Sequence, residues 1–129
     1  MHKEMILPES KFTDITDKID NFISQLDLQD GIVVLQVKDS EYAIVVTNSD
    51  TAHQEDIYND LIRVIPTKLE VQSEDVSALA RQVRTSILGR SLPLSVVEGS
   101  LRLQASDKVY LVTYDDQQSD VEVLMTAIS

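Results

Sequence analysis

Two runs of β-branched and aliphatic residues flank a short polar segment in the stretch VVLQVKDSEYAIVV, residues 33–46. The polar segment is KDSE, residues 38–41, and each flanking run has the length of a strand. The runs Ile32–Val37 and Tyr42–Thr47 are too continuously apolar for strands with one solvated face, so we expect two central strands. The polar segment between them is either an ordinary hairpin turn or the edge of a site.

Further strands are predicted on both sides of this stretch. The first lies within Lys3–Leu7 and stops at Pro8, and extended chain continues around residues 11–12. Turn residues such as Gly99 separate four more strand-like stretches near the C-terminus. These stretches are 94–97, 100–103, 108–114 and 121–128.

Two amphipathic helices are predicted from apolar spacing and caps. In the first, Asp14 or Thr16 is the expected N-cap. Its apolar residues are Ile19, Phe22, Ile23 and Leu26, at i, i+3, i+4 and i+7. The second is capped by Ser49 or Asp50 and ends before Pro66, because the residue before a proline avoids the helical region.

A third helix is predicted to start near Ser73 or Asp75 and to end at Gly89, a residue suited to a left-handed C-terminal position. Its expected buried stripe is Val76, Leu79, Val83 and Ile87. The only cluster of basic residues, Arg81, Arg84 and Arg90, lies on or just after this helix. We expect Arg81 and Arg84 on a solvated face, paired with neighbouring carboxylates.

The segregation of strands and helices favours an α+β fold with mostly antiparallel sheets in a sandwich-like arrangement and about three helices. The absence of repeats and linkers in 129 residues predicts one domain spanning residues 1–129. So many strands leave exposed edges, and an oligomer would cover them.

The composition excludes several classes of chemistry. There is no Cys, which removes thiolate metal sites and cysteine nucleophiles, and there is no P-loop. The two histidines, His2 at an expected frayed terminus and His53 on an expected surface turn, support neither a triad nor a histidine metal site. The net charge of -11 disfavours nucleic acid and anionic membranes. Without an apolar run for a signal peptide or a membrane span, a cytoplasmic location is expected.

Several segments, in this order and spacing, resemble the YjbQ family of small proteins, described as secondary thiamine-phosphate synthases, over nearly the full chain. Ile15-Thr16 is similar to the family's Asp-Ile-Thr, Leu88-Gly89 to its Leu-Leu-Gly, and residues 99–103 to its Gly-x-Leu-x-Leu. The resemblance implies an α+β fold of packed sheets and a homo-oligomer, usually a trimer, with sites near subunit interfaces.

The same resemblance places the family's site positions on residues of different chemistry. Asp39 corresponds to the metal-ligand histidine of the strand turn, and Gln82 to the histidine that opens the third helix. The family's Glu-x-Asp-Gly-Pro-Arg pattern runs from Thr113 to Gln118. Because Gln is a weak ligand and one Asp is not a site, the zinc-type site is predicted to be lost and no cofactor is expected.

Three functions remain open. The favoured one is a diverged, non-catalytic oligomeric binding module with an unknown ligand. The alternative is an enzyme, thiamine-phosphate synthase-like or other, with a site rebuilt around a hard cation such as magnesium from Asp39, Asp115, Asp116 and Gln82. The third, an adaptor that binds nucleic acid through the arginine cluster, is opposed by the net charge.

Overall fold

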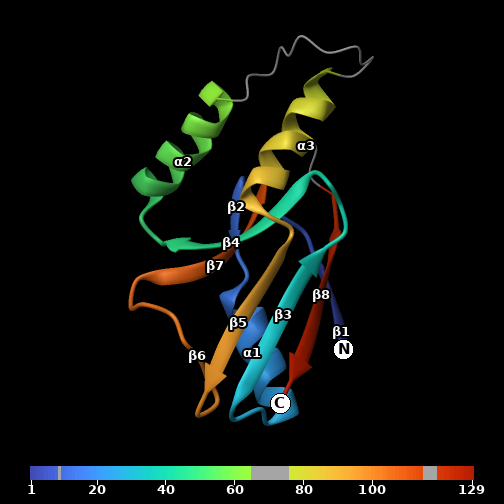
Figure 1. Ribbon diagram of the computed structural model, residues 1–129, viewed down its shortest axis with the longest axis vertical. Helices are drawn as coiled ribbons and strands as arrows, with labels where there is room; N and C mark the ends of the chain where they lie inside the picture. Colours follow the sequence, from blue (N-terminus) through green and yellow to red (C-terminus); the bar gives the residue numbers. More distant parts are fainter. Residues whose placement is uncertain (9, 65–75, 115–118) are drawn as a thin grey trace.

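The computed structural model describes residues 1–8, 10–64, 76–114 and 119–129, which form two antiparallel sheets and three helices (Figure 1). The larger sheet has the strand order β1 (His2–Ile6), β8 (Val121–Ile128), β3 (Gly31–Val37), β5 (Ser91–Val97) and β6 (Ser100–Leu101). The smaller sheet has the order β2 (Phe12–Asp14), β7 (Asp107–Thr113) and β4 (Tyr42–Asn48). The predicted α+β class with antiparallel sheets is confirmed.

The two strands of the opening stretch do not form a hairpin, so an ordinary hairpin turn, one of the two alternatives for residues 38–41, is wrong. Strand β3 lies between β8 and β5 in the larger sheet, whereas β4 is an edge strand of the smaller one. Residues 38–41 therefore form a corner that leads the chain from one sheet to the other (Figure 1). The expected central position holds for β3 and fails for β4, whose apolar run reflects burial between two layers.

The smaller sheet and helix α1 (Thr16–Leu26) pack against the inner face of the larger sheet. This main core includes Ile19 and Phe22 of α1, Val33 and Leu35 of β3, Ile44 of β4 and Leu111 of β7. Helices α2 (Thr51–Val64) and α3 (Val76–Leu88) cover the opposite face of the smaller sheet (Figure 1). The molecule is thus layered, and none of the three described helices lies over the outer face of the larger sheet.

The helix caps agree in part with the predictions. The carboxylate of Asp14 accepts the N–H of Thr16 at 2.9 Å, although Ile15 occupies the N-cap position of α1. Thr16 is not a cap: its Oγ1 accepts the N–H of Val109 at 3.0 Å and so ties α1 to β7. Asp50 caps α2 as predicted, because its Oδ1 accepts the N–H of Ala52 at 3.0 Å.

Helix α3 turns a different face to the core from the one predicted. Its described part starts at Val76, and the predicted starts at Ser73 and Asp75 lie outside the described residues. Ile87 is 55% exposed, whereas Arg84 and Thr85 are 4% and 0% exposed. The predicted stripe is therefore wrong at Ile87, because specific polar and aromatic partners draw Arg84 and Thr85 inward.

The two histidines lie apart. His53 is exposed on α2, as expected for a surface residue. His2 is not frayed, because it belongs to β1 and its ring stacks on Phe22 with centroids 5.6 Å apart.

Candidate functional site

The corner of residues 38–41 is held by its own hydrogen bonds. The Oδ1 atom of Asp39 accepts the N–H of Glu41 at 2.9 Å, and the N–H of Tyr42 donates to the carbonyl of Asp39 at 3.2 Å. An Asp side chain that bonds the backbone two residues ahead is a common way to set a turn. Asp39 thus shapes the corner, and its carboxylate is already engaged.

Helix α3 closes over the corner through an ion pair. The Nε of Arg81 donates to Oε2 of Glu41 at 2.8 Å, and both side chains are half-buried. Partial burial makes such a pair stronger than an exposed one, because solvent screens it less. The prediction that Arg81 pairs with a carboxylate is confirmed.

Two threonines bond the carbonyl groups of the corner. The hydroxyl of Thr85 donates to the carbonyl of Ser40 at 2.5 Å and lies 3.0 Å from the carbonyl of Gln82. The hydroxyl of Thr113, at the end of β7, donates to the carbonyl of Glu41 at 3.0 Å. Helix α3, the corner and β7 are therefore joined by short polar contacts.

Three of the four predicted site positions surround this corner. Asp39 is part of it, Thr113 bonds it directly, and Thr85 bridges it to the backbone of Gln82. The fourth, Gln118, lies outside the described residues, as do Asp115 and Asp116.

The residues at the corner do not fit a zinc-type ion. Neither histidine lies there, Asp39 is committed to its turn, and Glu41 is committed to Arg81. Within the described part of the chain, no group of three or more His, Cys, Asp or Glu side chains could hold a metal ion. The donor set lacks the imidazoles that a zinc site of this kind needs.

A stack of four side chains, which sequence reasoning missed, fixes the helices behind the corner. The rings of Tyr58 and Tyr114 stack at 4.1 Å, the amino group of Lys11 lies 5.8 Å from the centre of the Tyr58 ring, and the guanidinium of Arg84 lies 5.1 Å from the centre of the Tyr114 ring. The prediction that Arg84 lies on a solvated face is therefore wrong. No periodicity signals this stack, because its members come from four separate segments.

The side chain of Tyr114 is buried behind the corner. Burial, then the neighbouring Tyr58, raises the pKa of the Tyr114 phenol, and the charge of Arg84 opposes this only partly. Its hydroxyl donates to the carbonyl of Tyr58 at 3.1 Å. Tyr114 therefore remains a neutral structural donor.

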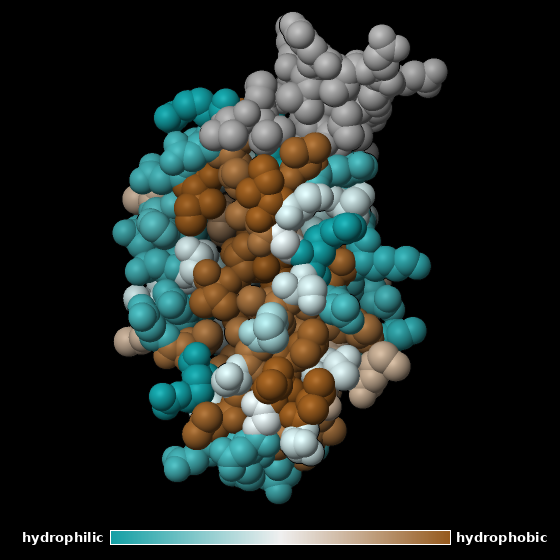
Figure 2. All heavy atoms as spheres, in the orientation of Figure 1, coloured by the Kyte–Doolittle hydropathy of each residue, from teal (hydrophilic) through white to brown (hydrophobic). Residues whose placement is uncertain are grey.

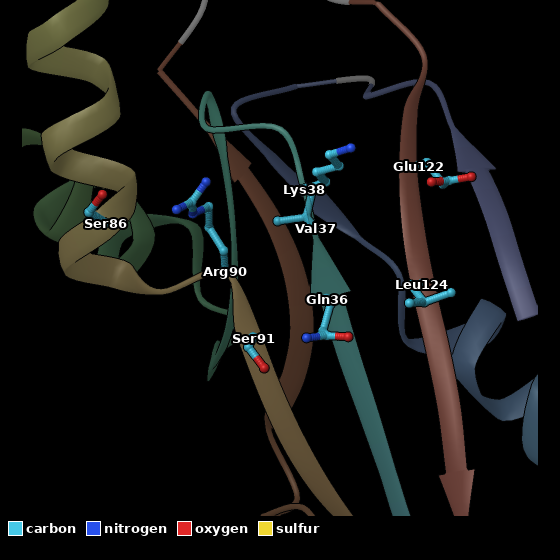
Figure 3. A pocket seen from close by; sticks show the side chains of 8 residues that line it. All are labelled: Gln36, Val37, Lys38, Ser86, Arg90, Ser91, Glu122 and Leu124. Carbon is cyan, nitrogen blue, oxygen red and sulfur yellow. The ribbon is translucent and has the colours of Figure 1, made fainter. Parts of the chain in front are cut away.

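A groove opens beside the corner, on the outer side of the larger sheet (Figure 3). It encloses about 670 Å³ and is lined by Gln36, Val37, Lys38, Ser86, Arg90, Ser91, Glu122 and Leu124. An adjoining hollow of about 470 Å³ shares Lys38 and Glu122 and reaches Asp39 and Asp120.

A sequence model of the YjbQ family, described as "UPF0047 protein YjbQ-like", matches residues 4–129. The chain belongs to the YjbQ family. This confirms the resemblance found in the sequence. No curated protein matches the chain.

Several solved structures share the fold. An uncharacterised conserved protein of the YjbQ/UPF0047 family from Clostridium acetobutylicum has a TM-score of 0.91 at 20% identity, covering 99% of this chain and 100% of that one. A YbjQ-like protein of unknown function from Sulfolobus solfataricus has a TM-score of 0.88 at 21% identity, covering 98% and 94%. A conserved hypothetical protein from Thermus thermophilus has a TM-score of 0.87 at 22% identity, covering 99% and 100%.

No helix in the described ranges is long and apolar enough to cross a membrane.

Proposed function

We propose that this YjbQ-family chain is a diverged, non-catalytic binding module that works as a homo-oligomer. The observation that carries the proposal is the set of contacts at the corner. Glu41 is paired with Arg81, Asp39 is bonded to its own turn, and the corner carbonyls accept bonds from Thr85 and Thr113. The polar groups at the family's site positions support one another, which leaves them a structural role.

The enzyme alternative requires a cation at these positions. Of the four residues proposed to hold it, Asp39 would have to exchange the N–H of Glu41 for the ion, and Asp115 and Asp116 lie outside the described residues. Magnesium also prefers six oxygen ligands in regular octahedral geometry. The binding-module proposal therefore predicts no tight metal and no synthesis of thiamine phosphate.

Metal binding tests the proposal directly. The melting temperature of the purified protein is measured with millimolar magnesium or calcium and with stoichiometric zinc, for the wild type and Asp39→Ala. We expect no metal-dependent increase in either protein, since a ligand that binds only the folded state must raise its stability. A large increase that disappears in Asp39→Ala, or chelator-sensitive thiamine-phosphate synthesis, would overturn the proposal.

The proposed self-association rests on the outer face of the larger sheet. Four large apolar side chains from four of its strands are exposed there, namely Met5, Ile32, Val97 and Ile128. Figure 2 shows apolar side chains along this side of the molecule, over β3, β5 and β8. Patches of this kind mark interaction surfaces.

Charge favours a second copy as the partner of this face. Alternate side chains of β1 and β8 point outward, and the charged ones among them are Lys3 and Glu122. Their charged groups lie 4.0 Å apart, so their opposite charges offset each other. The whole chain has a net charge of -11, so two copies repel each other through most of their surfaces. The apolar part of the outer face, outside the groove beside the corner, is where they can meet without that repulsion, in a trimer or another closed assembly.

A further inference from the structure

Most basic side chains in the described residues have a partner. Lys68 lies outside those residues, which leaves ten of the 11 Lys and Arg. Five of the ten form ion pairs with carboxylates, and Lys11 and Arg84 lie over tyrosine rings. Within the described ranges, the three without such a contact are Lys38, Arg90 and Arg102.

Two of these three cations line the same groove. Lys38 follows the end of β3, and Arg90 precedes β5. The two strand ends are adjacent, because the N–H of Val37 donates to the carbonyl of Arg90 at 2.9 Å. In Figure 3 both side chains extend beyond these strand ends, with the guanidinium of Arg90 turned toward α3 and the amino group of Lys38 turned toward β8.

Neutral groups that can take part in hydrogen bonds lie below the two cations. The amide of Gln36 and the hydroxyl of Ser91 come from paired positions of β3 and β5 and line the floor of the groove (Figure 3). Ser86, on the α3 wall, donates its hydroxyl to the carbonyl of Gln82 at 2.8 Å and so can still accept a bond. The groove thus combines two charged donors with uncharged polar groups.

The one acid among the lining residues is directed elsewhere. The carboxylate of Glu122 lies 4.0 Å from Lys3, and Figure 3 shows it turned toward β1 and away from Arg90. In a chain with 22 acids and 11 bases, cations readily find carboxylate partners. Two cations left without one line a single groove, and the acids Asp39 and Asp120 lie in the adjoining hollow on the Lys38 side.

We propose that the groove binds a small molecule through an oxyanion group, a carboxylate or a phosphate, held between Lys38 and Arg90. Arg presents a planar fork of donors that matches two oxygens of such a group, and Lys supplies a compact charge. Gln36 and Ser91 complete the contacts on the floor. This inference rests on the proposed function as a binding module and names the ligand class of the surface beside the corner.

A nuclear magnetic resonance titration tests this inference at the residue level. Inorganic phosphate and malonate are added separately to the ¹⁵N-labelled protein at constant ionic strength, and backbone amide shifts are followed. We expect saturable shifts at residues 36–38 and 90–91 with one or both probes. Lys38→Ala and Arg90→Ala should each weaken the apparent affinity about tenfold or more, since each removes one charged hydrogen-bond partner.

Arg102→Ala is the matched control, because it removes the third unpartnered cation from outside the groove. It should bind like the wild type, although it changes the net charge by the same amount. All three side chains are exposed, so the variants are expected to fold, and their melting temperatures check this. The probe that binds more tightly identifies the oxyanion as phosphate or carboxylate.

Two results would overturn the inference: no saturable shift with either probe, or equal weakening in Arg102→Ala and the groove variants. Neither result bears on the binding-module proposal. That proposal would be refuted by a metal-dependent increase in melting temperature or by thiamine-phosphate synthesis. Conversely, thiamine-phosphate synthesis by the purified protein would refute the proposed absence of catalysis. The measured affinity for phosphate or malonate would be unchanged by that result.

Discussion

Arg84 is a cation that the fold uses to pack an aromatic ring. Its guanidinium covers Tyr114, and its side chain is almost fully buried. Arginine suits this position because the guanidinium is planar and weakly hydrated compared with an ammonium group. Ile87 on the same helix remains exposed, so the usual distribution of apolar and charged residues is locally reversed.

Replacing Arg84 is expected to destabilise the protein. A desolvated cation–π contact contributes about 2 kcal/mol, so Arg84→Ala should lower the free energy of unfolding by about 2 kcal/mol or more, measured in urea. Arg84→Lys should recover only part of this, because an ammonium group does not stack. Arg102→Ala serves as the exposed control and should change stability little. Equal stability of Arg84→Ala and the wild type would contradict the packing role.

Glu4 gives the protein a stability that depends on pH. The hydrogen bond between Nε2 of His2 and Oε2 of Glu4, at 2.7 Å, lowers the pKa of Glu4 below its ordinary 4.5, and Lys18 adds to this against the opposing effect of burial. The stabilisation is therefore complete above pH 4.5 and is lost as the pH falls through the lower folded-state pKa.

Glu4→Gln tests this link between charge and stability. The wild type should be more stable than the variant at neutral pH, and the difference should close as the pH falls through the lowered folded-state pKa of Glu4. Urea unfolding at a series of pH values measures it. A difference that does not change with pH would show that the carboxylate charge is irrelevant.

At the scale of elements, local sequence signals located the strands and helices well. They did not predict strand pairing or the buried face of α3, because non-local contacts decide both. Pro8 and Pro66 in the sequence, the cap at Asp50 and the apolar spacing of α1 place these boundaries within a few residues. Whether β3 pairs with β4 is not local, because the same apolar runs suit a hairpin or a corner between sheets. The face that α3 buries likewise depends on partners far along the chain.

The candidate site shows the same division. The family resemblance brought Asp39, Gln82 and Thr113 to one corner, and the structure places them around it. The resemblance could not show that Glu41 and Arg81, which are 40 residues apart in the sequence, would form an ion pair at this corner. The groove cations Lys38 and Arg90 belong to none of the motifs and come together only through the β3–β5 register.

Strand β3 depends on a close approach at its first residue. A Cβ atom at Gly31 would collide with the backbone carbonyl oxygen of Ile128 on β8. Gly31→Ala should therefore cost about 1–3 kcal/mol of unfolding free energy by forcing the two strands apart. Hydrogen exchange of the β3 and β8 amides would locate the damage, and undiminished protection at Ile32 and Ile128 would contradict this explanation.

At the scale of the molecule, one sheet face is packed and the other is open. Light scattering coupled to size-exclusion chromatography should give a mass that is a multiple of the 14.5 kDa chain. Ile128→Lys should shift this mass toward the monomer, because it places a charge on the proposed interface. Ile87→Lys is the matched control: Ile87 is also 55% exposed, but it lies on α3. A monomeric wild type would contradict self-association.

The stacked pair Tyr58 and Tyr114 also provides a built-in optical reporter. The chain has no Trp, so its near-ultraviolet circular dichroism comes from four Tyr and two Phe, and two of these tyrosine rings are coupled at 4.1 Å. One ring belongs to α2 and the other follows β7, so their shared signal exists only while α2 is docked. Detachment of α2 would therefore be visible in the unlabelled protein before the sheets unfold.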